Sequence, residues 1–112
     1  EPYAPKSPFE TWVLPKAHSS SFDSISKELA KELAYVMRIM LKKLYIGLND
    51  PDYNYVIISS PCHERNLEYY HWYIKIIPRI THSAGFELGS GIYINTVVPE
   101  EAAKFLSNIN VV

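Results

Sequence analysis

Three side chains that could contact a ligand recur at alternate positions in the middle of the segment 69–95. They are His71, Tyr73 and Lys75, in a run that reads as a β-strand from His71 to Ile77 and ends at Pro78. Because successive side chains of a strand point to opposite faces, these three residues share one face and could hold a ligand or a partner. The opposite face is apolar and carries Trp72, Ile74 and Ile76.

The sequence gives little support for a metal site or a cysteine nucleophile. A metal site needs two or three imidazoles, thiolates or carboxylates that converge on one point. His63 and His71 are the candidate ligands, but they lack the close spacing typical of such a site, so we expect no bound metal. Cys62 is adjacent to His63, and neighbouring side chains of an extended chain point apart. We therefore interpret Cys62 as a small, unreactive residue.

Other catalytic motifs are missing from the sequence. There is no phosphate-binding loop, GxSxG, HExxH or CxxC. The run GFELGSG lacks the GxGxxG spacing, and no helix is predicted directly after it, which excludes a dinucleotide-binding turn. Lys16 and His18 follow the end of a predicted strand, where ligand contacts are common, and a solvated loop is the competing interpretation.

Strands account for much of the predicted structure that must position these groups. Runs rich in aromatic and β-branched residues predict strands at 9–14, 53–59, 71–77 and 86–95. The glycines in the last of these, Gly89 and Gly91, are explained as a bulge or a close backbone approach. Consecutive strands with short connections favour antiparallel pairing. In strand 9–14 the faces are Phe9, Thr11 and Val13 against Glu10, Trp12 and Leu14.

Two helices complete the predicted domain. A helix over 24–46 begins at Ser24 or Ser26, and Gly47 is suited to the position just after its end. A short helix within 96–109 has Pro99 in its first turn. Together with the strands they predict an α+β domain in two layers, in which the long helix covers one face of the sheet. The apolar stripe of the long helix is Leu29, Leu33, Val36, Met37, Met40, Leu41 and Leu44; that of the short helix is Ala102, Phe105, Leu106 and Ile109.

Composition limits the partners and the compartment. The 112 residues have a formal net charge of −1 without any block of like charge, which argues against nucleic acid as a partner. The apolar runs are too short to span a membrane, and a single cysteine excludes an internal disulfide, so we expect a cytoplasmic protein. The proline-rich residues 1–8 are predicted to be an extended linker or arm, and residues 9–112 the domain. A chain that begins Glu-Pro suggests a fragment or a processed product.

Four blocks of this sequence resemble a known enzyme family. PYAPKSPFETWVLPKAH, NDPDYNYVIISSP, YYHWYIKIIPR and GFELGSGIYINTVVPEEAAKFL are similar, in order, to the C-terminal half of hexose-1-phosphate uridylyltransferases, which include galactose-1-phosphate uridylyltransferases and ADP-glucose phosphorylases. The resemblance implies a histidine-triad-like fold, with an antiparallel sheet, one long helix packed on it and a short C-terminal helix. It covers essentially the whole chain.

The resemblance also implies an activity for the full-length protein. Such enzymes exchange UMP or AMP between a nucleotide-sugar and a hexose 1-phosphate through a histidine-linked intermediate. The His-Pro-His motif that supplies this histidine does not occur here, so the nucleophile is expected in a missing N-terminal half and no catalytic residue in this fragment. A stand-alone nucleotide- or partner-binding module is the alternative function. A histidine-triad hydrolase is disfavoured, since the place of its nucleophile is taken by Tyr73.

The same comparison of residues assigns roles to two sets of positions. Some family members bind a structural metal with histidines where Tyr73 and Lys75 stand, so His71, Tyr73 and Lys75 form a degenerate triad; Lys75 would repel a cation and could attract phosphate. Zinc or iron could still bind elsewhere in the full-length enzyme. The segment after the triad reaches the partner subunit's site in this family, which implies a homodimer and hexose-phosphate contacts by Phe86, Glu87, Gly89 and Ser90. Competing interpretations are a core role for Phe86 and a solvated Glu87.

Overall fold

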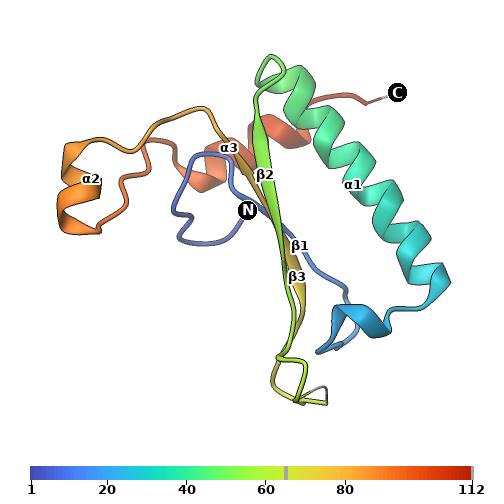
Figure 1. Cartoon of the computed structure of the whole chain (residues 1–112). Helices are drawn as coiled ribbons and strands as arrows, with labels where there is room; N and C mark the ends of the chain where they lie inside the picture. The colour runs from blue at the N-terminus through green and yellow to red at the C-terminus, as the bar shows by residue number, and fades with distance from the viewer. Residues whose placement is uncertain (65, 112) are drawn as a thin grey trace.

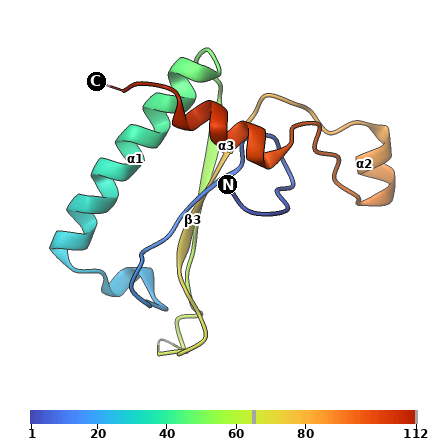
Figure 2. The same ribbon diagram turned by 180° about the vertical axis from the view of Figure 1, so that it is seen from behind.

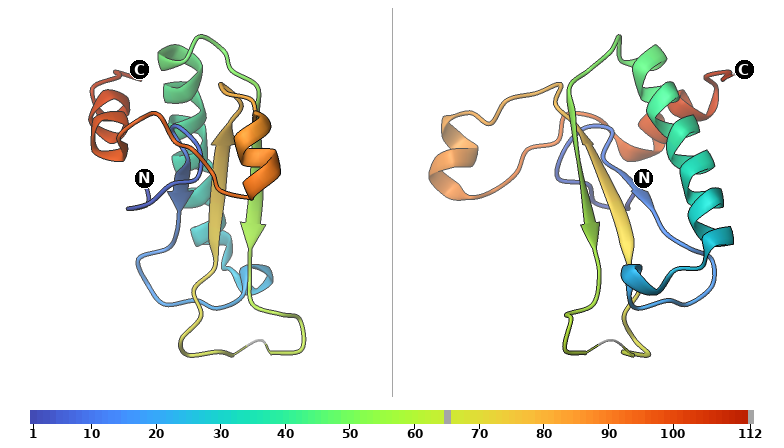
Figure 3. Two further views of the ribbon diagram at one scale, coloured as in Figure 1. Left: turned by 90° about the vertical axis from the view of Figure 1, so that its left-hand side faces the viewer. Right: turned by 45° about the vertical axis from the view of Figure 1, so that its right-hand side comes forward.

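The sheet consists of three antiparallel strands in the spatial order β1-β3-β2 (Figures 1 and 3). The computed structural model describes residues 1–64 and 66–111, and within them β1 is Thr11–Val13, β2 is Tyr53–Ile58 and β3 is Tyr73–Pro78. The strands at the N-terminus, after the long helix and in the triad segment are confirmed. The central strand is β3, which pairs with β1 on one side and with β2 on the other.

The two faces of β3 differ as the alternation of its residues predicts. Trp72, Ile74 and Ile76 are buried, whereas Tyr73 and Lys75 are partly exposed. The buried set joins the hydrophobic core with Leu44 of the long helix and Leu106 near the C-terminus. The apolar face of β3 is therefore the inner face of the sheet. Its opposite side is called the outer face below, and carries Glu10, Trp12, Tyr73 and Lys75.

The long helix α1, Lys27–Gly47, covers the inner face (Figure 1). Ser26 caps it, since its side chain accepts a hydrogen bond from the amide of Leu29. Gly47 is the last helical residue rather than the one after it. A Cβ there would lie 2.4 Å from Ile109 and 2.9 Å from Phe105, so this glycine permits close helix packing instead of a left-handed turn. Most of the predicted stripe packs against the core, namely Leu29, Leu33, Met37, Met40, Leu41 and Leu44; Val36 is exposed.

The predicted strand at 86–95 is wrong. Residues Gly85–Ser90 form a short helix, α2, and Gly91 ends it in the left-handed conformation with φ of 71°. The predicted antiparallel pairing with β3 is not possible, because both edges of β3 are already occupied by β1 and β2. Residues 79–98, called the arm below, therefore leave the sheet. They project on the side away from α1 (Figure 2), and Gly89 is explained by neither a bulge nor a close approach.

The chain ends in a third helix, α3, which spans Pro99–Ser107. Of its predicted stripe, Ala102 and Leu106 are buried and Ile109 packs against the core, but Phe105 is 45% exposed. The ammonium of Lys43 on α1 donates to the carbonyl of Leu106 over 2.7 Å. A single 3-10 turn, η1 at Phe22–Ser24, precedes α1. Among residues 1–64 and 66–111, no helix combines the length and the apolar character that crossing a bilayer requires.

Candidate functional site

An aromatic pair lies at the centre of the outer face. Trp12 of β1 is opposite Lys75 of β3, which places the indole beside Tyr73. The two rings stack with centroids 4.4 Å apart and an interplanar angle of 23°. Trp12 is 37% exposed, so one flat apolar surface remains available to a ligand or to another protein segment.

Beside this pair lies a buried carboxylate that balances the charge of Lys75. Glu10 is only 3% exposed, and one of its oxygens accepts a hydrogen bond of 2.9 Å from the indole Nε1 of Trp12. The Nζ of Lys75 lies 3.7 Å from the same oxygen, and the amide of Lys6 donates to the other oxygen over 3.1 Å. The ammonium is thus held within the face by Glu10. Any anion attracted to Lys75 would compete with this ion pair.

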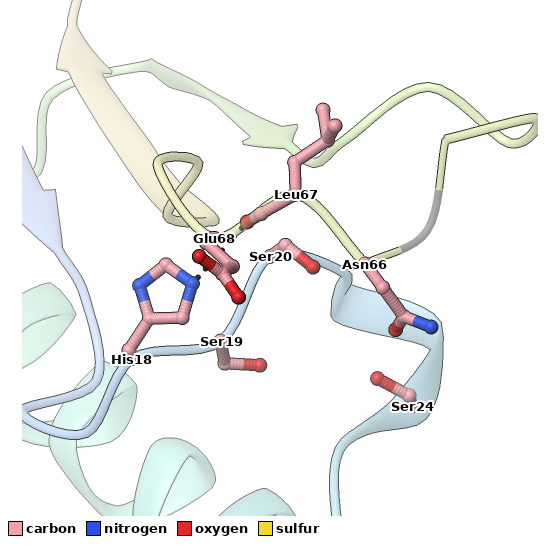
Figure 4. A pocket seen from close by; sticks show the side chains of 7 residues that line it. All are labelled: His18, Ser19, Ser20, Ser24, Asn66, Leu67 and Glu68. Carbon is pink, nitrogen blue, oxygen red and sulfur yellow. Dashed lines mark hydrogen bonds between the residues drawn. The ribbon is translucent and has the colours of Figure 1, made fainter.

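Two histidines meet at the end of the sheet where β1 stops and β3 begins. The rings of His18 and His71 are 5.5 Å apart in an edge-to-face arrangement, and Nε2 of His18 is 3.3 Å from the carbonyl oxygen of Leu67. His18 also borders a cavity of about 310 Å³ whose other walls are mostly polar (Figure 4). The cavity is lined by His18, Ser19, Ser20, Ser24, Asn66, Leu67 and Glu68.

From the sequence, His18 could be either a ligand-contacting residue or part of a solvated loop, and its proximity to His71 was not predicted. An available signal was the antiparallel pairing of the two strands. Since β1 runs antiparallel to β3, the residues after β1 must lie beside those before β3. His63, the other candidate ligand, is 81% exposed at its side chain and has Glu64 at 4.0 Å as its neighbour.

The residues assigned to hexose phosphate lie together on the arm. Glu87 is partly exposed, and its two oxygens accept hydrogen bonds from the amides of Ala84, at 3.1 Å, and Ile94, at 3.0 Å. These two hydrogen bonds, of which the one from Ile94 has the larger effect, lower the pKa of the Glu87 carboxyl from its ordinary value of 4.5. Each oxygen keeps a further lone pair for a ligand hydroxyl. Phe86 is 58% exposed and is therefore not a core residue within these 112.

The hydroxyl of Ser90 supports the helix rather than pointing freely into solvent. It donates to the carbonyl of Phe86 over 2.6 Å and accepts from the amide of Ile92 over 3.2 Å. The arm is joined to the N-terminal segment by two contacts. The side chain of Asn95 donates to the carbonyl of Pro5, and the ammonium of Lys6 lies 4.9 Å from the centre of the Tyr93 ring.

Comparison with known proteins gives close relatives over the whole chain, although no protein-family model matches it. An ADP-glucose phosphorylase of Arabidopsis thaliana is 42% identical over 97% of this chain, and a galactose-1-phosphate uridylyltransferase of Thermotoga maritima is 31% identical over 98%. The crystal structure of the Arabidopsis phosphorylase with bound ADP-glucose superimposes with a TM-score of 0.93 at 41% identity, covering 98% of this chain and 36% of that one.

Over nearly its whole length the chain is similar to part of an ADP-glucose phosphorylase and to part of a galactose-1-phosphate uridylyltransferase. It spans about a third of the curated relatives that it matches, 32% of the phosphorylase and 37% of the uridylyltransferase. That share is consistent with the C-terminal domain predicted from the sequence. A more distant structure shows the fold: a histidine-triad-like protein of Bartonella henselae superimposes with a TM-score of 0.66 at 20% identity, over 95% of this chain and 74% of that one. The predicted fold class is confirmed.

The side chains of His71, Tyr73 and Lys75 do not fit a metal ion. Within residues 1–64 and 66–111, no group of three or more histidine, cysteine, aspartate or glutamate side chains is arranged to hold one. At the two positions where the family resemblance implied metal-binding histidines, Tyr73 stacks on Trp12 and Lys75 pairs with Glu10. A fixed ammonium group would repel a cation at this place.

Proposed function

We propose that this chain is the C-terminal, non-nucleophilic half of a nucleotidyltransferase. The full-length enzyme would exchange UMP or AMP between a nucleotide-sugar and a hexose 1-phosphate. A histidine in the N-terminal half would attack the α-phosphorus of the nucleotide-sugar and release the hexose 1-phosphate. A second hexose 1-phosphate would then take the nucleotidyl group from the histidine and restore the free imidazole. The similarity of the whole chain to ADP-glucose phosphorylase and galactose-1-phosphate uridylyltransferase carries this proposal.

The outer face supports a role without a nucleophile. The middle position of the triad is Tyr73, whose phenol is a poor nucleophile near neutral pH and whose ring is packed on Trp12. The nearest histidine, His71, comes two residues earlier, so it would sit at another place on the strand. We therefore assign no chemical step to this face. Its residues would instead form part of the wall of the site in which the other half transfers the nucleotidyl group.

The arm would supply the hexose-binding groups. Phe86 presents an exposed ring that can pack on a sugar face, and Glu87 keeps lone pairs for sugar hydroxyls in a backbone frame that is already formed. The backbone at Gly89 is open, since a Cβ there would contact nothing within 4 Å, and Ser90 holds the turn. In a cytoplasmic homodimer active in carbohydrate metabolism, this arm would reach the site of the partner subunit.

We further propose that the outer face works without a metal. The ammonium of Lys75 lies 3.7 Å from the carboxylate of Glu10, so the local charge is balanced by the side chains alone. Zinc or iron, if the full-length enzyme contains either, would then belong to its other half.

The intact mass of the protein from its native source tests the proposal. This chain has a mass of 12.9 kDa, and its share of the Arabidopsis relative predicts a native protein about three times heavier. We expect peptide sequencing to find His-Pro-His in the additional part, and uridylyl or adenylyl transfer in the intact protein. A native mass of 12.9 kDa would contradict the half-enzyme.

One observation favours a second candidate function. The exposed indole of Trp12 forms an aromatic platform with a cation nearby, since Lys75 lies 5.9 Å from its ring centre. Such a platform could hold a nucleotide without chemistry, as a stand-alone binding module would. Titration of the 112-residue chain with UMP and AMP, followed by Trp fluorescence, distinguishes the two functions. A module binds nucleotide by itself, whereas a half-enzyme that lacks most of the nucleotide pocket does not.

A further inference from the structure

The arm has an internal frame, but that frame does not fix where the arm lies relative to the sheet. The hydrogen bonds of Glu87 join residues of the arm to one another, namely Glu87 to Ala84 and to Ile94. Its helix α2 is open to solvent, and Leu88 is 76% exposed. The position of the arm must therefore be set by the residues that it contacts elsewhere in the chain.

The returning limb of the arm, residues 93–95, is tied to the N-terminal segment. The side-chain amide of Asn95 donates to the carbonyl of Pro5 over 3.3 Å, and the ammonium of Lys6 lies 4.9 Å from the centre of the Tyr93 ring. The N-terminal segment loops out on the side of the sheet on which the arm projects (Figures 1 and 2). The position of this limb therefore depends on where residues 5 and 6 lie.

Residues 5–10, called the strap below, form a folded turn. The backbone amide of Lys6 donates to Oε2 of Glu10 over 3.1 Å, and the backbone amide of Glu10 donates to the carbonyl of Ser7 over 3.3 Å. Pro8, inside this turn, is fully buried. The side chain of Glu10 thus holds the part of the strap that contacts the arm.

The direction of the strap is fixed by packing at Phe9. This residue has a φ of 59°, in the left-handed region that favours glycine. Its ring packs edge-to-face on Phe105 of α3 with centroids 5.8 Å apart, and its carbonyl accepts a hydrogen bond of 3.1 Å from the hydroxyl of Thr11. The strained backbone is maintained by these contacts on both sides, so the strap leaves β1 in one defined direction.

The two oxygens of Glu10 serve different parts of the molecule. Oε1 faces the outer face, where it contacts Nε1 of Trp12 and Nζ of Lys75, and Oε2 holds the strap through Lys6. A carboxylate accepts at both oxygens, whereas a carboxamide accepts at one and donates at the other. Full ionisation of Glu10 is therefore what allows it to bond the outer face and the strap together.

We propose that the strap couples the outer face to the arm, with Glu10 as the residue that positions the arm. The bonding partners of Glu10 lie on the strap, on β1 and on β3, so its effect passes through Lys6 and Pro5 to the limb 93–95. The inference rests on contacts within this chain and not on the proposed transfer. Either one can fail without the other.

Hydrogen exchange followed by NMR tests the coupling in the 112-residue chain, with the amide of Ile94 as the reporter of the arm. Glu10→Gln replaces one acceptor oxygen by a donor, and Asn95→Asp removes the donor to Pro5 while it keeps an oxygen for the amide of Val97. Each variant should lower the protection factor of Ile94 about fivefold, as the loss of one hydrogen bond of ordinary net strength would. The double variant should also lose about fivefold rather than about 25-fold, because both changes open the same link.

Two control variants separate this coupling from general effects. Leu44→Ala removes a core side chain that is 2% exposed and should destabilise the domain, yet leave the protection of Ile94 unchanged. Asn54→Asp makes the same chemical change as Asn95→Asp on the exposed part of β2, and it should also have no effect on Ile94.

A second measurement leaves Glu10 unaltered. Since coupling between two sites is reciprocal, Asn95→Asp should shift the NMR resonance of the Trp12 Nε1–H, which Glu10 holds, whereas Asn54→Asp should not. The proposal is overturned if Glu10→Gln leaves the protection of Ile94 unchanged, if the two losses simply multiply, or if Leu44→Ala lowers it equally. A Trp12 resonance that stays in place in Asn95→Asp would overturn it as well.

Discussion

Replacing Lys75 with methionine should destabilise the domain, because it leaves the carboxylate of Glu10 buried without its cation. The Nζ of Lys75 is 3.7 Å from that carboxylate, Glu10 is 3% exposed, and the Lys75 side chain is 23% exposed. Methionine keeps an unbranched chain of similar length, so the packing of its stem along the outer face is largely preserved. The substitution therefore tests the charge.

The size of the effect follows from three contributions. At this distance, and with an effective dielectric constant of about 20, the gross attraction between the charges is about 4 kcal/mol. Breaking a buried ion pair by removing one partner typically costs about 3–5 kcal/mol. Two hydrogen bonds to Glu10 remain, from Trp12 and from the amide of Lys6, and they continue to stabilise the carboxylate. We expect Lys75→Met to lower the free energy of unfolding by about 2–3 kcal/mol.

The assay is urea unfolding at pH 7, followed by circular dichroism, of the unaltered domain, Lys75→Met, Glu10→Gln and the double variant. In a double-mutant cycle, the sum of the losses of unfolding free energy in the two single variants should exceed the loss in the double variant by about 1–2 kcal/mol. The reason is that glutamine at position 10 leaves no buried charge that needs Lys75. A coupling free energy below about 0.5 kcal/mol would refute the argument, since Lys75 and Glu10 would then act independently. Unfolding midpoints with and without EDTA complete the experiment, and we expect them to be equal.

Three further results are expected. Ile76→Ala should lower the free energy of unfolding by about 3–4 kcal/mol in urea titrations, because the fully buried side chain leaves a cavity beneath the sheet. Gly47→Val should cost about 1–2 kcal/mol by the same measurement and loosen the contact with Ile109, whereas an exposed Ala34→Val should cost less. For Glu87, a lowered pKa in the folded arm means a stabilising contribution that is present above pH 4.5 and is lost as the pH falls below it. The protection factors of amides in 84–94, which are exchange rates corrected for the intrinsic pH dependence, should therefore fall in acid. Glu87→Gln should lower them at pH 7 as well, and equal protection in both proteins would contradict the role of this carboxylate.

The sheet and the arm differ in how well this chain buries their apolar side chains, and this difference fits a domain that binds rather than catalyses. The sheet packs on the hydrophobic core, and its outer face carries the Glu10–Lys75 ion pair. The arm carries exposed apolar side chains that this chain does not bury, including Phe86, Leu88 and Ile92. Such a segment is typical of a contact made with another part of a protein.

Much of this molecule is determined by local pattern and could be predicted from the sequence. The 3.6-residue period of α1 and the two-residue alternation around Tyr73 depend on neighbours within a few positions, so the sequence alone identifies them. The sequence left the cap open between Ser24 and Ser26, and the structure shows that it is Ser26. The four blocks of family resemblance are likewise a property of the sequence. So is the absence of a His-Pro-His motif, which shifts the proposed chemistry to another part of the protein.

Features that depend on which strands are neighbours in the sheet became visible only in the tertiary structure. The segment predicted to be a strand paired with β3 forms α2 instead; in the order β1-β3-β2 both edges of β3 are taken, and strand order cannot be read from periodicity. The same order brings His18 to His71, although they are 53 residues apart in the sequence (71 − 18). It also buries Glu10 against Lys75, a pair that neither residue's neighbours predict. Pairing across a sheet is a non-local choice made by the packing of the whole chain, and it determined which side chains meet on the outer face.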